Sequence, residues 1–338
     1  MNRRYMILAL ALFVLTLGGC YDNNETDILA TVMAVGIEGT HPERTYTFAV
    51  ADTGGLSDSS RGDGAGVICF GAAAPDVASA IKIVDAKTSK KLSFSHLSAI
   101  LFSQDAIAEG VFDDTDYFQK KAYVRPQTML AVTEASPGDY LNKLNLSLEA
   151  NPERYFESLL KKKNTYVPEC SISDFVTAYH TQTQCLVPIV SYADAQGAES
   201  AQISASILAG EGMSVAMIED NWLLGLVLDT REVRRGFDTL QSIKKPAIDV
   251  VLKDNIPFVS VSLAVRAEPR VDAAALEDEI ETKLTSYARN LCDVVNIATL
   301  ARGNFRLWKD YSKYEWSSLV KNAVFDVKVT LLEEDNYD

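Results

Sequence analysis

The chain has 338 residues, of which 47% are hydrophobic and 23% are charged, enough for two or three globular domains. It carries 46 Asp and Glu against 32 Lys and Arg, a net charge of −14. Because nucleic acids and anionic lipid headgroups repel such a chain, the charge argues against a nucleic-acid partner and against membrane attachment by overall charge.

The first 19 residues have the pattern of a signal peptide. Arg3 and Arg4 precede an apolar run over 6–17, which is shorter than the ~20 residues that a membrane-spanning helix needs. The run ends in a Leu-Gly-Gly-Cys sequence at Cys20, which matches the bacterial lipobox, where the thiol is diacylated and the chain is cut before the cysteine. The alternative is an ordinary secretory signal with a chance cysteine. We expect a lipoprotein signal peptide over 1–19 and lipid attachment at Cys20.

Lipid attachment would tether the mature chain to a membrane. Cleavage before Cys20 removes two arginines and no acids, which leaves 30 basic and 46 acidic residues and a net charge of −16. One acyl chain holds a protein only marginally, whereas two or more fatty chains such as palmitate hold it stably. Residues 20–26 are expected to be a short polar tether. The body is expected at the extracytoplasmic face, without crossing the membrane.

An N-terminal α+β domain is predicted over 27–192, and a subdivision near 145–150 is considered. Its β-rich and amphipathic segments alternate, which is typical of a mixed α+β fold. Strands are expected at 27–36, 44–50, 97–102 and 128–133, and helices at 75–91, 103–109, 113–121, 136–144, 151–163 and 171–179. Residues 53–66 are rich in Gly, Ser and Asp and are expected to form a mobile loop.

A linker is predicted over 193–203 and a C-terminal α+β domain over 204–338. The clearest element is a long amphipathic helix, because apolar residues at 276, 280, 284, 287 and 291 form one stripe. The other expected elements are a hairpin of 213–218 with 222–228, a helix over 230–240, paired strands 247–252 and 257–266, a helix over 300–308 and a strand over 324–332. The fold class is therefore α+β and multi-domain, with mixed sheets flanked by helices.

No segment has the spacing of a catalytic, cofactor-binding or metal site. His96 lies among apolar residues, but no Ser, Cys or Asp is spaced to partner it, so structural packing is favoured over a catalytic base. The acids of Asp113–Asp116 lack the glycine and closing Glu of a calcium loop, and stabilisation of a helix start explains them. The lysines at 161–163 can touch lipid phosphates, although a solvated helix end is the default.

Four cysteines follow Cys20, and none has CxxC or zinc spacing. Cys170 and Cys185 are the pair closest in sequence. A disulfide between them is one alternative, because the protein is expected outside the cytoplasm. Two buried free thiols are the other, since free cysteines are commonly buried.

Several stretches resemble, in the same order, the Ger(x)C family, the C subunits of spore germinant receptors. They are GCYDNNETDILATVMAVGIE, KLSFSHLSAILFS, VRPQTMLAVTEASPGDYL, MSVAMIEDNWLLGLVLDTREVRRGF and NFRLWKDYSKYEWSSLVKNAVFDVKVTLLEE. The chain departs from the family pattern in having Tyr21 for Trp, Lys120 for Arg, and Asp220-Asn221 for Asp-Gly. The loop over 53–66 has no counterpart in the pattern.

The resemblance implies a lipid-anchored, non-enzymatic subunit on the outer face of the spore inner membrane. It would assemble with integral-membrane subunits that respond to nutrients, and Cys20 is the residue to which the family pattern gives a chemical role. Whether such a subunit binds the germinant itself is open. An extracytoplasmic ligand-binding lipoprotein of the solute-binding type is the main alternative, and an extracytoplasmic hydrolase is another.

Overall fold

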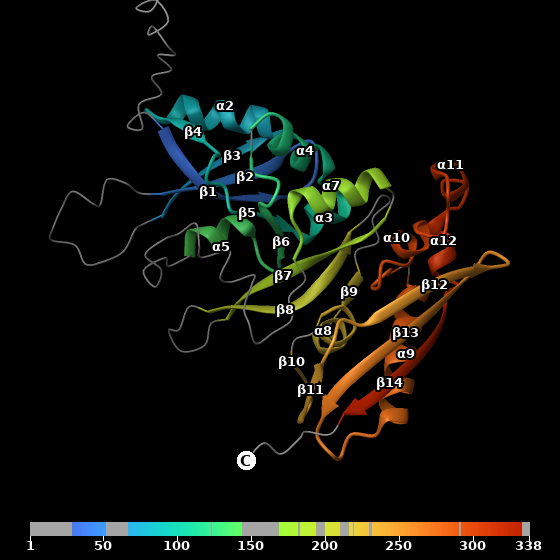
Figure 1. Cartoon of the computed structure of the whole chain (residues 1–338). Helices are drawn as coiled ribbons and strands as arrows, with labels where there is room; N and C mark the ends of the chain where they lie inside the picture. The colour runs from blue at the N-terminus through green and yellow to red at the C-terminus, as the bar shows by residue number, and fades with distance from the viewer. Residues whose placement is uncertain are drawn as a thin grey trace, which may run out of the picture.

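The chain folds around two β-sheets, each with its own helices and core (Figure 1). The computed structural model describes residues 29–51, 67–122, 124–143, 169–181, 183–193, 200–209, 216–218, 220–229, 232–290 and 292–332. The predicted signal peptide, tether and 53–66 loop, the subdivision near 145–150 and the helix over 151–163 lie outside these residues.

The first sheet has nine strands in the order β3-β2-β1-β5-β6-β7-β8-β9, with β4 beside β1. The strands are β1 (Leu29–Glu38), β2 (Arg44–Ala51), β3 (Val67–Ala74), β4 (Lys91–Ser93), β5 (Ala99–Ser103), β6 (Met129–Thr133), β7 (Cys185–Ala193), β8 (Ser200–Ala209) and β9 (Ala216–Ile218). The central pairs from β1 through β7 are parallel, and both outer parts are antiparallel. The sheet is therefore mixed, as predicted.

Helices cover both faces of this sheet. The helices α2 (Val77–Lys87), α3 (Gln104–Glu109), α4 (Phe112–Lys120) and α7 (Ile172–Thr181) bury side chains in one core, and α5 (Pro137–Lys143) buries Tyr140 and Leu141 in a smaller core. Every residue of β5 and of β6 is buried. Such continuous burial is typical of parallel strands with a helical layer on each side.

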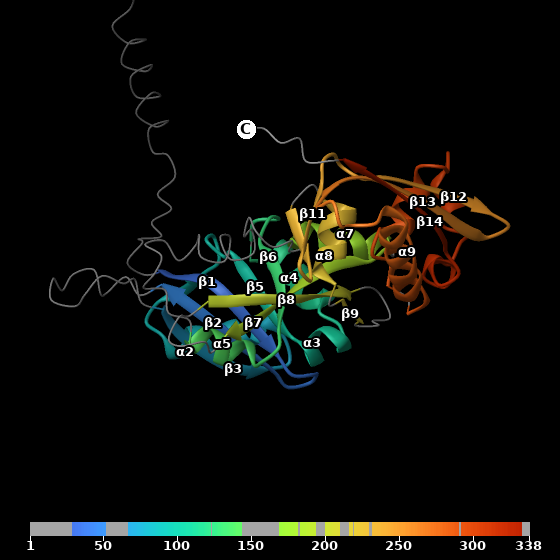
Figure 2. The same ribbon diagram turned by 90° about the horizontal axis from the view of Figure 1, so that it is seen from below.

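The second sheet has five strands, centred on β13. The elements are α8 (Asn221–Leu228), β10 (Glu232–Arg235), β11 (Asp238–Ser242), β12 (Ala247–Lys253), β13 (Ile256–Ala267), α9 (Ala273–Arg289), α10 (Ile297–Arg302), α11 (Trp308–Tyr311), α12 (Trp316–Val320) and β14 (Val324–Leu332). Residues of β13 alternate between buried and exposed over most of its length, because one face of the sheet packs on helices. Figure 2 shows α9 against that face.

The amphipathic stripe predicted for 276–291 is confirmed in α9. Leu276, Ile280 and Leu284 are fully buried and Tyr287 packs at the edge of the core, while position 291 is outside the described residues. Asp272 begins the helix by accepting a hydrogen bond from the backbone N–H of Ala274. The strand predicted over 324–332 is likewise confirmed as β14.

Three predictions for the second half are wrong. The segment expected as the second hairpin strand is helix α8, in which four successive apolar positions around Gly225 are buried, so no strand alternation exists there. The segment expected as a helix over 230–240 forms β10 and β11, joined by a turn at Gly236 with a φ of +61°. The helix expected over 300–308 is divided between α10 and α11.

The predicted linker is interrupted by strand pairing. Ala193 at the end of β7 pairs with Ser200 at the start of β8, so both described ends of the 193–203 segment belong to the first sheet. Strand β8 runs across the predicted boundary at 204 and β9 follows it, and both strands belong to the first sheet. The change from the first sheet to the second lies between β9 and β10.

Candidate functional site

Cys20, the predicted lipid-attachment residue, lies outside the described residues. The described chain begins at Leu29 in β1, nine residues later. An extended chain covers at most about 3.6 Å per residue, so Leu29 lies within roughly 30 Å of whatever holds Cys20. Any membrane that binds Cys20 is thus close to the first strand of the fold.

Two simple classes of site, a membrane-spanning helix and a cluster of metal ligands, are absent from the described parts of the chain. None of the helices described there is both long and apolar enough to cross a membrane. Within the same residues, no three or more His, Cys, Asp or Glu side chains are grouped so that they can hold a metal ion.

The three histidines lie in different parts of the fold. His96 is exposed in the turn before β5, so the expectation that it packs in the core is wrong: Phe94 and Leu97 take the buried positions beside it. His180 lies in the last turn of α7, with its ring edge-on to Phe112. His41 lies in the turn between β1 and β2.

A buried ion-pair cluster joins β2 to helices α3 and α4. Arg44 is fully buried and donates to Asp114, to Glu109 at 2.8 Å and to the carbonyl of Gly110 at 2.7 Å. The hydroxyl of Tyr46 donates to the other Asp114 oxygen at 2.9 Å. Asp114 was expected only to stabilise a helix start, but the structure shows it as the buried partner of an arginine. Nothing in the local sequence pairs residues 70 positions apart.

The pKa values in this cluster follow burial and hydrogen bonding. Burial raises the pKa of Asp114, while the nearby Arg44 guanidinium acts in the opposite direction. Burial and the Asp114 carboxylate raise the pKa of Tyr46. The backbone N–H of His41 is the main cause of the lowered pKa of Glu109. Because these groups bind one another, we assign the cluster to stability rather than to ligand binding.

A second polar cluster joins α8 to α9. Asp220 immediately precedes α8 and accepts hydrogen bonds from Lys283 at 2.9 Å and from the Tyr287 hydroxyl at 2.6 Å. Although burial opposes it, the hydrogen bonds from these two side chains lower the pKa of Asp220. The Asp220-Asn221 pair, noted above as a departure from the family pattern, therefore lies at a helix start rather than in a hairpin turn.

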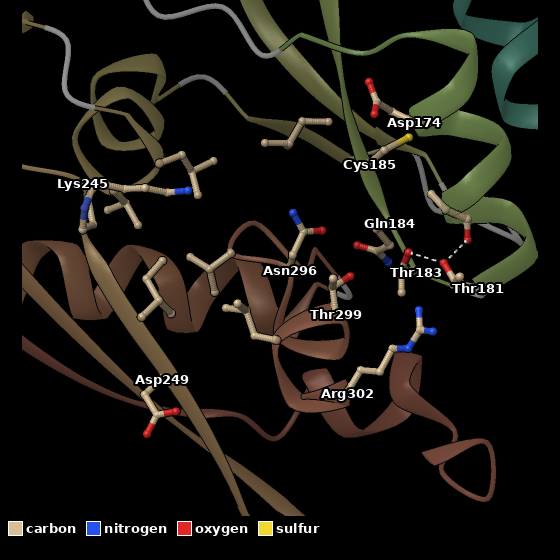
Figure 3. Close-up of a pocket in the computed structure, with 18 of the residues that line it drawn as sticks. Asp174, Thr181, Thr183, Gln184, Cys185, Lys245, Asp249, Asn296, Thr299 and Arg302 are labelled. Atoms are coloured by element: carbon tan, nitrogen blue, oxygen red, sulfur yellow. Dashed lines mark hydrogen bonds between the residues drawn. The ribbon is translucent and has the colours of Figure 1, made fainter. Parts of the chain in front are cut away.

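A pocket of about 930 Å³ lies between the two sheets (Figure 3). One wall comes from the end of α7 and the start of β7, and the other from β12 and α10. Its polar side chains include Asp174, Thr181, Thr183, Gln184, Lys245, Asp249, Asn296, Thr299 and Arg302. The volume lies in the range of small-molecule sites, which is about 300–1,000 Å³. No sequence pattern predicts this pocket, because its walls come from segments that are distant in the chain.

A hydrogen bond beside the pocket connects the two halves of the fold. The backbone N–H of Asp293 donates to the side-chain oxygen of Gln184 at 2.7 Å. The Asp293 carboxylate accepts from the backbone N–H groups of Ile297 and Ala298, so it caps α10. Burial raises the pKa of Asp293 to about 6.

Cys170 and Cys185 are free thiols in contact, with their Sγ atoms 3.8 Å apart. Cys170 is buried, and Cys185 lies in the pocket wall. The hydrogen bond to Cys185 and then burial raise the pKa of the Cys170 thiol. A raised pKa keeps the thiol protonated and weakly nucleophilic, which argues against a reactive cysteine here.

Comparison with known proteins gives one family and one fold. Residues 22–192 match the model of the spore germination protein N-terminal domain. The structure is similar to the crystal structure of the GerBC protein, with a TM-score of 0.51 and 13% sequence identity, over 89% of this chain and 97% of that chain. At this identity the likeness shows the fold. No curated protein matches the chain.

Proposed function

The chain belongs to the Ger(x)C family of spore germination proteins, and from this premise we propose that it is a lipid-anchored, non-enzymatic subunit of a nutrient germinant receptor. The observation that carries the proposal is the position of the family match, which begins at residue 22, two residues after Cys20. The matched domain therefore follows the predicted cleavage site directly, as expected for the body of a mature lipoprotein.

In this proposal, acyl chains on Cys20 hold the protein at the extracytoplasmic face of the spore inner membrane. The folded body then contributes surfaces for assembly with integral-membrane subunits, which supply the membrane-spanning part of the receptor. The strongly acidic composition supports attachment through the acyl chains rather than through the folded body, because the overall charge opposes binding to anionic lipid.

The first experiment tests acylation and assembly together. Native protein from spore membranes is extracted in mild detergent, its mass is measured, and co-purifying proteins are identified. We expect an acylated amino-terminal Cys20 and integral-membrane partners. The Cys20→Ala variant should remain an uncleaved precursor or leave the lipid, whereas Cys69→Ala, which removes a different thiol, should behave as wild type. An unmodified Cys20 in a freely diffusing protein would refute the anchor, and an acylated protein that extracts alone would refute the assembly.

The pocket supports one alternative, an extracytoplasmic ligand-binding lipoprotein of the solute-binding type. Its volume fits a small molecule, and polar side chains from both halves of the fold line it. The two candidates differ in what the isolated protein does. Calorimetry of the detergent-extracted chain with amino acids and sugars should show no tight binding if assembly is the function. Tight stoichiometric binding by the chain alone, weakened by a Lys245→Ala change in the pocket wall, would favour the alternative.

A further inference from the structure

Residues 300–321, here called the tip, combine exposed apolar side chains with positive charge. Leu300, Leu307 and Trp308 are 38%, 48% and 49% exposed. The tip contains five basic and two acidic residues, a net charge of +3 in a chain whose overall charge is −14. The basic residues, all exposed, are Arg302, Arg306, Lys309, Lys313 and Lys321. A cationic and apolar tip on an acidic protein points to a partner that is both anionic and apolar.

Aromatic contacts hold Trp308 in place. Its ring centroid lies 5.2 Å from that of Tyr311, which stacks in turn on the buried Trp316. The Arg302 guanidinium lies 4.9 Å from the centre of the Trp308 ring. Trp308 is therefore half-exposed, and its ring is held in place by Tyr311 and Arg302. Tryptophan beside Arg and Lys is the combination enriched where proteins meet the membrane–water interface.

The tip lies toward the same side of the molecule as the start of β1. In Figure 1, α11, α2 and the beginning of β1 are all at the upper side of the fold. The second half of helix α2 and the turn after it add positive charge there. Residues 82–91 contain four lysines and one aspartate, a net charge of +3, and Lys82 is exposed on the helix. Because Leu29 lies within roughly 30 Å of Cys20, a bilayer that holds Cys20 can reach this side.

We propose that the tip, together with α2, forms a face that lies on an anionic phospholipid surface. The inference rests on the proposed lipid anchor and adds the orientation of the anchored body. Lipid is favoured over a protein partner because the outward features are an interfacial tryptophan, the exposed Leu307 beside it and scattered basic residues. The acidic remainder of the chain then faces away from the membrane, which removes the repulsion expected from its overall charge.

The test uses the full acylated protein in vesicles of phosphatidylcholine alone or mixed with phosphatidylglycerol. Quenching of tryptophan fluorescence by nitroxide-labelled lipids reports contact between a tryptophan and the lipid. The quenching that is lost in Trp308→Phe is the part that comes from Trp308. The variant Arg306→Gln/Lys309→Gln removes two tip charges. Each basic residue near an anionic surface contributes about 1 kcal/mol. Loss of both charges should therefore lower the equilibrium constant for contact between the tip and the lipid roughly thirtyfold. Lys244→Gln/Lys328→Gln, which removes two exposed charges outside the tip, is the matched control.

We expect Trp308 to be quenched on the anionic vesicles, and this quenching to fall in the tip variant but not in the control. A vesicle-bound protein with unquenched Trp308, or with quenching that ignores both lipid charge and the tip variant, would overturn the proposal and leave the anchor intact. Shielding of Trp308 only after integral-membrane subunits are added would also overturn it, because the tip would then be a protein interface. Failure of the acylated chain to bind any vesicle would instead count against the proposed function.

Discussion

Removal of Asp114 should destabilise the first sheet and its helices more than most single substitutions. Asp114 is 4% exposed in its side chain, and its partner Arg44 is 0% exposed, so Asp114→Ala leaves a buried guanidinium without its closest carboxylate. Glu109 remains, but its side chain is 34% exposed and solvent weakens its contribution. Breaking a buried ion pair by removing one partner costs about 3–5 kcal/mol, a large part of the roughly 5–15 kcal/mol that stabilises a typical domain.

The assay can separate the two halves of the fold. All three tryptophans, Trp222, Trp308 and Trp316, lie in the second half, so their fluorescence reports on that half, whereas circular dichroism reports on both. In urea, Asp114→Ala should lower the dichroism midpoint and leave the tryptophan transition near that of the wild type. The exposed neighbour provides the control, because Asp113→Ala should change stability by less than about 0.5 kcal/mol.

A double substitution tests the reason for the loss. Arg44→Met/Asp114→Leu removes both charges and keeps apolar volume, so much of the lost stability should return. If Asp114→Ala is as stable as Asp113→Ala, the Arg44–Asp114 contact is not a stabilising buried pair. If the double variant is no better than Asp114→Ala, packing rather than an unpaired charge explains the loss.

Three further predictions concern the second half of the fold and the thiol pair. Leu284→Asp should abolish the tryptophan transition, because Leu284 is 1% exposed and an unpaired charge would enter the core, while the exposed change Glu281→Ala should be silent. Since the pKa of Asp293 is raised to about 6, folding should weaken as pH rises from 4 to 7, by at most about 3 kcal/mol, and the pH profile of the melting temperature should flatten in Asp293→Asn. Copper–phenanthroline should oxidise Cys170 and Cys185 to a disulfide with loss of two hydrogen masses, and a disulfide formed with another cysteine instead would contradict this contact.

The sequence predicted well those elements whose burial follows a local period. The stripe of α9 was found because its apolar positions recur at helical spacing, and β14 because its residues alternate. The strand predicted at 222–228 is wrong because nearly all residues of α8 are apolar, and a short apolar run of this kind does not distinguish a buried helix from a strand.

Long-range partners were beyond the reach of sequence patterns. Arg44 is the first residue of β2, and only the fold brings Asp114 to it. The pairing of β7 with β8 likewise overrode a stretch that had the composition of a linker. The walls of the pocket also come from distant segments, and Gln184 and Asp293, which are hydrogen-bonded beside it, are 109 positions apart. Spacing within one segment carries no information on such contacts.

Strands β13 and β14 are parallel neighbours, and the chain between them contains α9 and the whole 300–321 segment. The segment begins in α10, which packs in the core of the second sheet, and it leads into β14, whose first residue Val324 pairs with Phe258 of β13. Arg302 stacks on Trp308 and also belongs to the pocket wall. A force applied to α11 is therefore transmitted through Trp308 and Arg302 to the pocket wall between the two halves of the protein. The connection between β13 and β14 thus couples α11 mechanically to that junction.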